Sequence, residues 1–132
     1  MTPTEIARSL LGVPWVHQGR NPTVGLDCAG LLIVAYGESD EPDYGRDPQE
    51  GKLEAEITSR VGPPLEGCED IRAGDIVAMA YAGDIRHCGM VALGDDGRLN
   101  LIHTDSRLGR LVEHPLDGKW MRRVRMVWRP NR

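Results

Sequence analysis

Residues 27–37 read DCAGLLIVAYG, a short and almost wholly apolar run that follows an acid and ends at a glycine. The apolar pattern by itself fits a helix or a buried strand. Asp27 is a suitable helix N-cap and Gly37 a suitable C-terminal stop, so we expect a helix that begins at Cys28. The N–H groups at a helix N-terminus lower the pKa of a nearby thiol. The run therefore predicts a helix with a candidate nucleophile at its first residue.

The alternative for Cys28 is a buried structural cysteine, which is the commoner role of a free cysteine. On this stretch alone, that alternative is favoured. If Cys28 is a nucleophile, Ala29 and Gly30 leave the approach to sulfur open and let backbone N–H groups face an oxyanion. We interpret Asp27 as a cap or ion-pair partner, because an acid with a catalytic role there would oppose thiolate formation.

The rest of the chain predicts an α+β domain in which helices come first and an antiparallel meander follows. On the N-terminal side we expect a helix over 2–12, extended chain at 13–15, a loop at 17–26, a polar loop at 38–51 and a short exposed helix at 52–61. After residue 74 the period changes to that of strands, which we expect at 75–81, 87–93, 99–104, 111–113 and 120–128.

Two histidines decide between the two interpretations of Cys28. His87 opens one predicted strand and His103 closes the next. Antiparallel neighbours joined by a short turn place the start of one strand beside the end of the other, so both imidazoles lie at one end of the sheet. This arrangement supplies a base and a residue that orients it, which a cysteine nucleophile requires.

The other candidate residues carry weaker signals. His17 and the amide of Gln18 lie in the loop before Cys28 and could contact substrate. His114 precedes a proline and is interpreted as a solvated turn residue. Cys88 follows His87 directly, so on a strand it points to the opposite face and belongs to the core. Cys68 has no evident partner.

Composition and spacing exclude several classes of function. The chain has 132 residues and a net charge of −4, which fits a single domain over 1–132 and argues against nucleic-acid binding. No run approaches the roughly 20 apolar residues that span a bilayer, and residues 1–15 do not read as a secretory signal. We therefore expect a protein made in the cytoplasm, without a membrane partner. The three cysteines have no pairing pattern, and the Cys and His spacing fits no zinc motif, so no metal is expected.

With Cys28, His87 and His103, five segments resemble the NlpC-type family of papain-like cell-wall cysteine peptidases. They follow one another through most of the chain: GVPWVHQGR (12–20), GLDCAGLL (25–32), AGDIVAM (73–79), RHCGMVA (86–92) and LIHTDSRLGRLVEH (101–114). Three features are most similar to members encoded by tailed bacteriophages: HQGR, residues 44–48 and the closing EH-P-L-x-x-x-W.

The resemblance implies a papain-like fold in which the nucleophile helix packs on a small antiparallel sheet. Cys28 would be the nucleophile, His87 the general base and His103 the residue that orients it, with no cofactor. Trp15 stands where the family often has a tyrosine that helps to bind substrate or the oxyanion. Ala29 replaces a frequent serine at a position whose backbone matters most.

The implied substrate is a peptidoglycan stem peptide, cut between D-Glu and the diamino acid. The implied setting is a phage tail or another delivered particle that acts at the cell wall, with other tail proteins as partners. Two alternatives stay open: a structural tail-tip or adaptor protein with the same fold and little activity, and a related thiol amidase or acyltransferase. Whether the 38–51 loop gates the site is also open.

Overall fold

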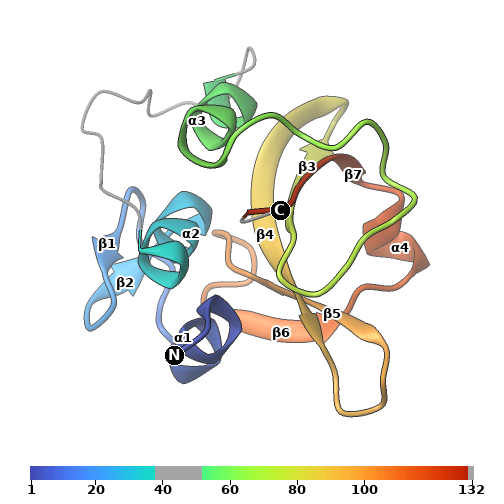
Figure 1. Ribbon diagram of the computed structural model, residues 1–132. Coiled ribbons are helices and arrows are strands. Elements are labelled where there is room, and N and C mark those ends of the chain that lie inside the picture. The colour runs from blue at the N-terminus through green and yellow to red at the C-terminus, as the bar shows by residue number, and fades with distance from the viewer. Residues whose placement is uncertain (38–51, 131–132) are drawn as a thin grey trace.

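The protein is an α+β fold, described here for residues 1–37 and 52–130 of a computed structural model (Figure 1). Three helices come first: α1 (Pro3–Ser9), α2 (Cys28–Tyr36) and α3 (Lys52–Val61). They are followed by the strands β3 (Ile76–Tyr81), β4 (Asp84–Leu93), β5 (Leu99–His103), β6 (Val112–Pro115) and β7 (Val124–Trp128). A small ribbon of β1 (Arg20–Asn21) and β2 (Gly25–Leu26) precedes α2, and the short helix α4 (Gly118–Met121) precedes β7.

Helix α2 forms for the local reasons that its sequence predicts. The Asp27 side chain accepts a hydrogen bond from the N–H of Gly30 at 2.7 Å, which caps the N-terminus. Gly37 ends the helix in the left-handed conformation, with φ of 71°. The residues between the caps are apolar on every side, and α1 and β4 pack against the helix. Leu31 and Leu32 are among its buried residues.

The five long strands form one antiparallel sheet in the order β6-β5-β4-β3-β7. Strands β3 to β6 are the predicted meander, whereas β7 returns to the other side of β3. One face of the sheet packs on the helices, and Cys88, Met90 and Ile102 belong to that core. The opposite face holds a second core that includes Val77 and Leu101, covered in part by the segment that joins α3 to β3.

The prediction of one strand over 120–128 is wrong at its start. The Asp117 side chain accepts a hydrogen bond from the N–H of Trp120 at 3.3 Å, which caps the single turn of α4, so the strand begins only at Val124. This local cap outweighs the alternating pattern. The loop expected at 17–26 likewise contains β1 and β2, which pair antiparallel.

Helix α3 has the predicted bounds, but it is not exposed on all sides. Leu53 and Ile57 are buried against the helix-side core, one turn apart on the same face. The polar loop expected at 38–51 lies outside the described residues, so a gating role for it stays untested.

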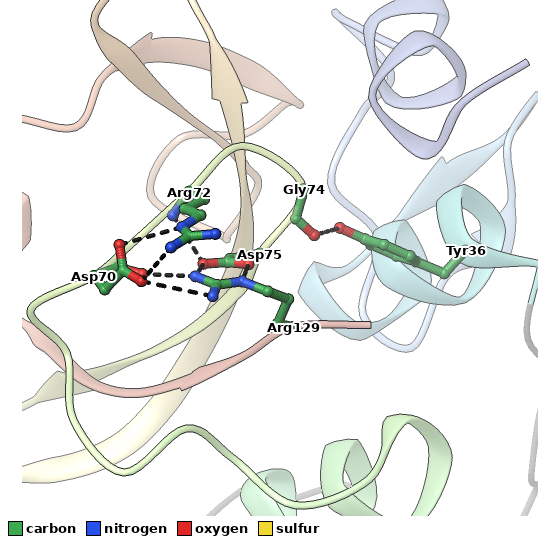
Figure 2. A network of polar contacts seen from close by, with 6 residues as sticks. All are labelled: Tyr36, Asp70, Arg72, Gly74, Asp75 and Arg129. Carbon is green, nitrogen blue, oxygen red and sulfur yellow. Dashed lines mark hydrogen bonds and ion pairs between the residues drawn. The ribbon is translucent and has the colours of Figure 1, made fainter. Parts of the chain in front are cut away.

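A buried carboxylate ties the start of β3 to the end of β7, as Figure 2 shows. Asp75 is 1% exposed and accepts two hydrogen bonds from the Arg129 guanidinium, both at 2.9 Å. It also accepts one from the backbone N–H of Arg72 at 2.8 Å. Beside it, the Tyr36 hydroxyl donates to the carbonyl oxygen of Gly74 at 2.7 Å. The Gly-Asp pair within segment 73–79 therefore joins three elements: α2, β3 and β7.

Candidate active site

Cys28 is the first residue of α2 and lies half-buried at the N-terminal end of the helix. The Asp27 carboxylate beside it caps the helix and pairs with Arg20, whose guanidinium nitrogen lies 2.7 Å from the carboxylate oxygen. Burial, and next the neighbouring Cys28 thiolate, raise the pKa of Asp27. The prediction that Asp27 is a cap and an ion-pair partner is confirmed.

Gly30 allows α2 to approach the chain that precedes it. A Cβ placed on Gly30 would collide with the backbone carbonyl oxygen of Gly19. The glycine was expected to leave room around the sulfur of Cys28, whereas its closest neighbour is this backbone. The requirement is therefore one of packing, and it fixes the helix start against the β1–β2 ribbon.

His87 and His103 meet at one end of the sheet, as the strand pattern predicts. Both are buried, and Nε2 of His87 lies 2.7 Å from Nδ1 of His103. The register of β4 and β5 continues to Gly89 beside His103, where a Cβ would lie 3.0 Å from the Cβ of His103. Glycine at this position makes room for the second imidazole over the strand.

A third imidazole joins these two, so the prediction of a solvated turn for His114 is wrong. His114 lies in β6, half-buried, with its Nε2 2.7 Å from Nε2 of His103. Its Nδ1 lies 2.9 Å from the carbonyl oxygen of Pro115. In the register of β5 and β6, His114 is opposite Leu101, which places it on the same sheet face as His103. Extending the strand predicted at 111–113 by one residue would have found it.

Two groups on β4 act on the pKa of the Cys28 thiol. Hydrogen bonds from the Cys88 thiol and from His87, with the positive charge of His87, hold the pKa of Cys28 well below its usual value despite burial. The same thiol–thiol hydrogen bond, with burial, raises the pKa of Cys88 well above its usual value. Cys88 thus stays protonated and donates to a Cys28 thiolate. The core position predicted for Cys88 is confirmed, but its contact with Cys28 is not foreseen by the strand pattern.

Burial keeps the middle imidazole neutral. It lowers the pKa of His103 to about 3, and the neighbouring charges of His87 and His114 act in the same direction. The Trp120 indole packs against His103 in a T-shaped arrangement, with ring centroids 4.7 Å apart and planes at 79°. His103 is therefore a fixed and uncharged partner for His87 at neutral pH.

Tyr81 packs on the ring of His87 and was not singled out by any motif. The two rings stack with centroids 5.4 Å apart and planes at 18°. The Tyr81 hydroxyl donates to the Asp105 carboxylate at 3.0 Å, and burial raises the pKa of Tyr81 to about 12. The guanidinium of Arg107 lies 4.3 Å from the centroid of the same tyrosine ring. These contacts hold the His87 imidazole in one plane.

The residues predicted to contact substrate lie in two places. Trp15 is half-buried, donates its backbone N–H to Gly109 at 2.9 Å and has its ring 6.3 Å from that of the exposed His17. Gln18 follows in a left-handed conformation, with φ of 56°. Ala29 lies in the first turn of α2 and lines a small apolar pocket between α2 and α3. Their roles in binding stay predictions.

Within the described ranges, 1–37 and 52–130, the structure contains no cluster of metal-binding side chains and no membrane-spanning helix. No group of three His, Cys, Asp or Glu side chains there is arranged to hold a metal ion. The facing nitrogens of the three imidazoles are taken up by one another and by a carbonyl oxygen. No described helix is long and apolar enough to cross a bilayer.

Comparison with protein families gives a match over most of the chain. The model of the NlpC/P60 family matches residues 12–129, a range that contains all three candidate catalytic residues. No curated protein matches the chain.

Solved structures show the same fold. The chain is similar to the NlpC/p60 domain of the peptidoglycan hydrolase SagA, with 19% identity and a TM-score of 0.63 over 96% of this chain and 95% of that one. It is also similar to NlpC1 from Trichomonas vaginalis, with 19% identity and a TM-score of 0.66 over 97% of this chain and 42% of that one. A third similar structure is an NLP/P60-family protein, described as similar to lipoprotein, from Staphylococcus aureus subsp. aureus Mu50. It has 20% identity and a TM-score of 0.63 over 98% of this chain and 40% of that one.

These likenesses confirm the predicted papain-like fold. The chain spans nearly all of the first structure and about two fifths of the other two. At these identities the likeness concerns the fold.

Proposed function

The chain belongs to the NlpC/P60 family, and from that premise we propose that it is a cysteine peptidase that hydrolyses an amide bond in peptidoglycan stem peptides. The observation that carries the proposal is the pair of buried imidazoles, with His87 Nε2 2.7 Å from His103 Nδ1, together with a Cys28 thiol at a helix N-terminus whose pKa His87 lowers. A nucleophile at a helix N-terminus, a base within reach and a third group behind the base are the parts that thiol acyl transfer needs.

The reaction follows from the positions of these groups. His87 takes the proton of Cys28, and the thiolate attacks the amide carbonyl carbon. Helix geometry leaves the first N–H groups of α2 without intrahelical partners, and those of Cys28 and Ala29 can face the oxyanion. His87 then gives its proton to the leaving amine, which leaves a thioester on Cys28. Water, deprotonated by His87, hydrolyses this thioester and restores the thiol.

Peptidoglycan as the substrate is supported by the family and by the fold shared with the NlpC/p60 domain of SagA, a peptidoglycan hydrolase. The cut between D-Glu and the diamino acid is part of the proposal and is supported by the resemblance of the motifs alone. The location of the protein in a phage tail or delivered particle is also part of the proposal and is likewise supported by the resemblance of the motifs alone. There the protein would have tail proteins as partners and would act at the cell wall. Of the features behind that location, residues 44–48 lie outside the described ranges.

The test is digestion of purified muropeptides, with products identified by mass spectrometry. We expect wild type to release the products of a single stem-peptide cut and Cys28→Ala to release none, because the nucleophile is lost. Cys68→Ala is the matched control. This half-buried cysteine packs against the second core, on the sheet face opposite the helices, and its replacement should keep the activity. A wild-type protein that cleaves no muropeptide, or a fully active Cys28→Ala, contradicts the proposal. Cleavage of a simple ester or amide but no muropeptide would indicate a different thiol hydrolase.

A further inference from the structure

Three imidazoles form a hydrogen-bonded row that ends at a backbone carbonyl. His87 Nε2 meets His103 Nδ1 at 2.7 Å, and His103 Nε2 meets His114 Nε2 at 2.7 Å. The row closes where His114 Nδ1 meets the carbonyl oxygen of Pro115 at 2.9 Å. The proposed mechanism uses only the first two of these rings. His114 and the carbonyl therefore need an explanation of their own.

When the three rings are uncharged, the carbonyl oxygen of Pro115 sets the direction of every hydrogen bond in the row. A carbonyl oxygen can only accept, so Nδ1 of His114 carries a hydrogen and donates it. In the uncharged form of the ring, Nε2 of His114 then carries no hydrogen and accepts, so Nε2 of His103 donates to it. Because His103 is neutral, its Nδ1 carries no hydrogen and accepts from Nε2 of His87.

The direction of the row decides which nitrogen of His87 can act as the base. With Nε2 committed as a donor to His103, the neutral His87 has its lone pair on Nδ1, the ring nitrogen left for the thiol of Cys28. Nδ1 can then take the thiol proton. The protonated ring still donates from Nε2 to His103, so the row keeps the same direction in both states of the base.

The packing around His103 supports this direction of the hydrogen bonds. His103 is 0% exposed, and Trp120 contacts both it and His114, with ring centroids 4.7 Å and 5.1 Å away. His103 has little room to turn, so it can respond to its surroundings mainly by moving its hydrogen from one nitrogen to the other. If the hydrogen moved to Nδ1, it would face the N–H of His87. His87 would then have to accept at Nε2 and would lose the lone pair at Nδ1.

We infer that His114 is a positioning residue, which holds the hydrogen of His103 on Nε2 and thereby fixes His87 as a base towards Cys28. The inference rests on the proposed pairing of Cys28 with His87. It extends that pairing to the imidazole at the far end of the row, whose hydrogen-bond partners are His103 and the carbonyl oxygen of Pro115.

The test compares two replacements of His114 that differ in whether they can accept a hydrogen bond. The amide oxygen of His114→Gln can accept from Nε2 of His103, whereas His114→Leu cannot. The measurement is the rate of Cys28 alkylation by iodoacetamide against pH, in a Cys68→Ala background, which reports the thiolate without any peptidoglycan. Far-ultraviolet circular dichroism and the melting temperature check that both variants are folded.

We expect His114→Gln to stay within about threefold of the parent and His114→Leu to lose on the order of 10-fold to 100-fold in alkylation rate near neutral pH, because the buried N–H of His103 loses its acceptor. The loss should be smaller than the ~10⁴-fold fall known for replacing the orienting carboxylate of a serine protease, because His103 is still present. An unchanged His114→Leu, or a folded His114→Gln that is impaired as much as His114→Leu, overturns the inference.

A second measurement needs no variant and separates this inference from the proposed function. Nitrogen-15 chemical shifts of the wild-type imidazoles at neutral pH should show hydrogen on Nε2 of His103 and on Nδ1 of His114. The opposite tautomers overturn the inference even if His114→Leu fails to fold. If the expected tautomers are found but wild type cleaves no muropeptide, the row stands as described and the peptidase proposal fails.

Discussion

The charge and the capping role of Asp27 can be separated by two substitutions. Asp27→Ala removes the cap of α2 and the partner of Arg20 together. Asp27→Asn keeps an oxygen that can accept from the N–H of Gly30 but removes the charge. If the cap is what matters for folding, the two variants should differ in stability although both lack the carboxylate.

The expected losses of unfolding free energy follow from the contacts that Asp27 makes. Loss of an N-cap costs about 1 kcal/mol, within a range of about 0.5–2. Loss of the ion pair, whose side chains are each 17% exposed, adds to this cost for Asp27→Ala. Removal of a carboxylate whose pKa is raised by burial offsets part of it. We therefore expect Asp27→Ala to lose about 1–2 kcal/mol and Asp27→Asn to stay within about 0.5 kcal/mol of wild type.

The raised pKa of Asp27 fixes the direction in which its contribution to folding stability changes with pH. Because the pKa of Asp27 is raised in the folded state, the folded protein holds this proton more tightly than the unfolded chain does. Its contribution to stability is present below the unfolded value of about 3.9 and is lost as the pH rises through the raised folded value. Asp27→Asn should therefore gain stability relative to wild type as the pH rises through that window.

Urea unfolding measures these differences. For a small protein with a slope of about 1–3 kcal/mol per molar urea, Asp27→Ala should lower the urea midpoint by roughly 0.3–2 M. The reasoning is refuted if Asp27→Asn is destabilised as much as Asp27→Ala. It is also refuted if Asp27→Asn loses stability relative to wild type as the pH rises from about 4.

Two further substitutions test the packing and the electrostatics around the thiol. Gly30→Ala should cost roughly 1–3 kcal/mol in thermal or urea unfolding, because its Cβ meets a backbone carbonyl that cannot move aside easily. Gly118→Ala, whose nearest neighbour is 3.4 Å away at the end of a flexible side chain, is the control and should change stability by less than about 0.5 kcal/mol. Cys88→Val removes the hydrogen bond to Cys28 and should raise the pKa of the Cys28 thiol. The pH profile of Cys28 alkylation should then shift to higher pH. Cys68→Ala should leave that profile in place, and an unshifted Cys88→Val would contradict the assignment of the donor.

Much of the fold follows from local signals that the sequence carries openly. The acid before Cys28 and the glycine at 37 mark the ends of α2, and both act as caps in the structure. The bounds of α3 and the presence and order of the four strands of the meander also follow from period and turn residues. Two strand bounds differ by more than one residue from those expected: β4 begins at Asp84 rather than at 87, and β6 runs to Pro115 rather than to 113. Where two local signals compete, the pattern misleads: alternation over 120–128 predicts a strand, but the cap at Asp117 makes a helical turn first.

The sequence by itself determined the helix that presents Cys28 and the sheet end at which His87 and His103 meet. Caps, turns and strand alternation are properties of neighbouring residues, so they can be recognised without coordinates. Only the tertiary structure decided that His114 completes the row and that Cys88 contacts the thiol of Cys28. Both contacts depend on the register of strands and on how α2 seats against β4. Those distances arise from packing between segments far apart in the chain, which no local pattern encodes.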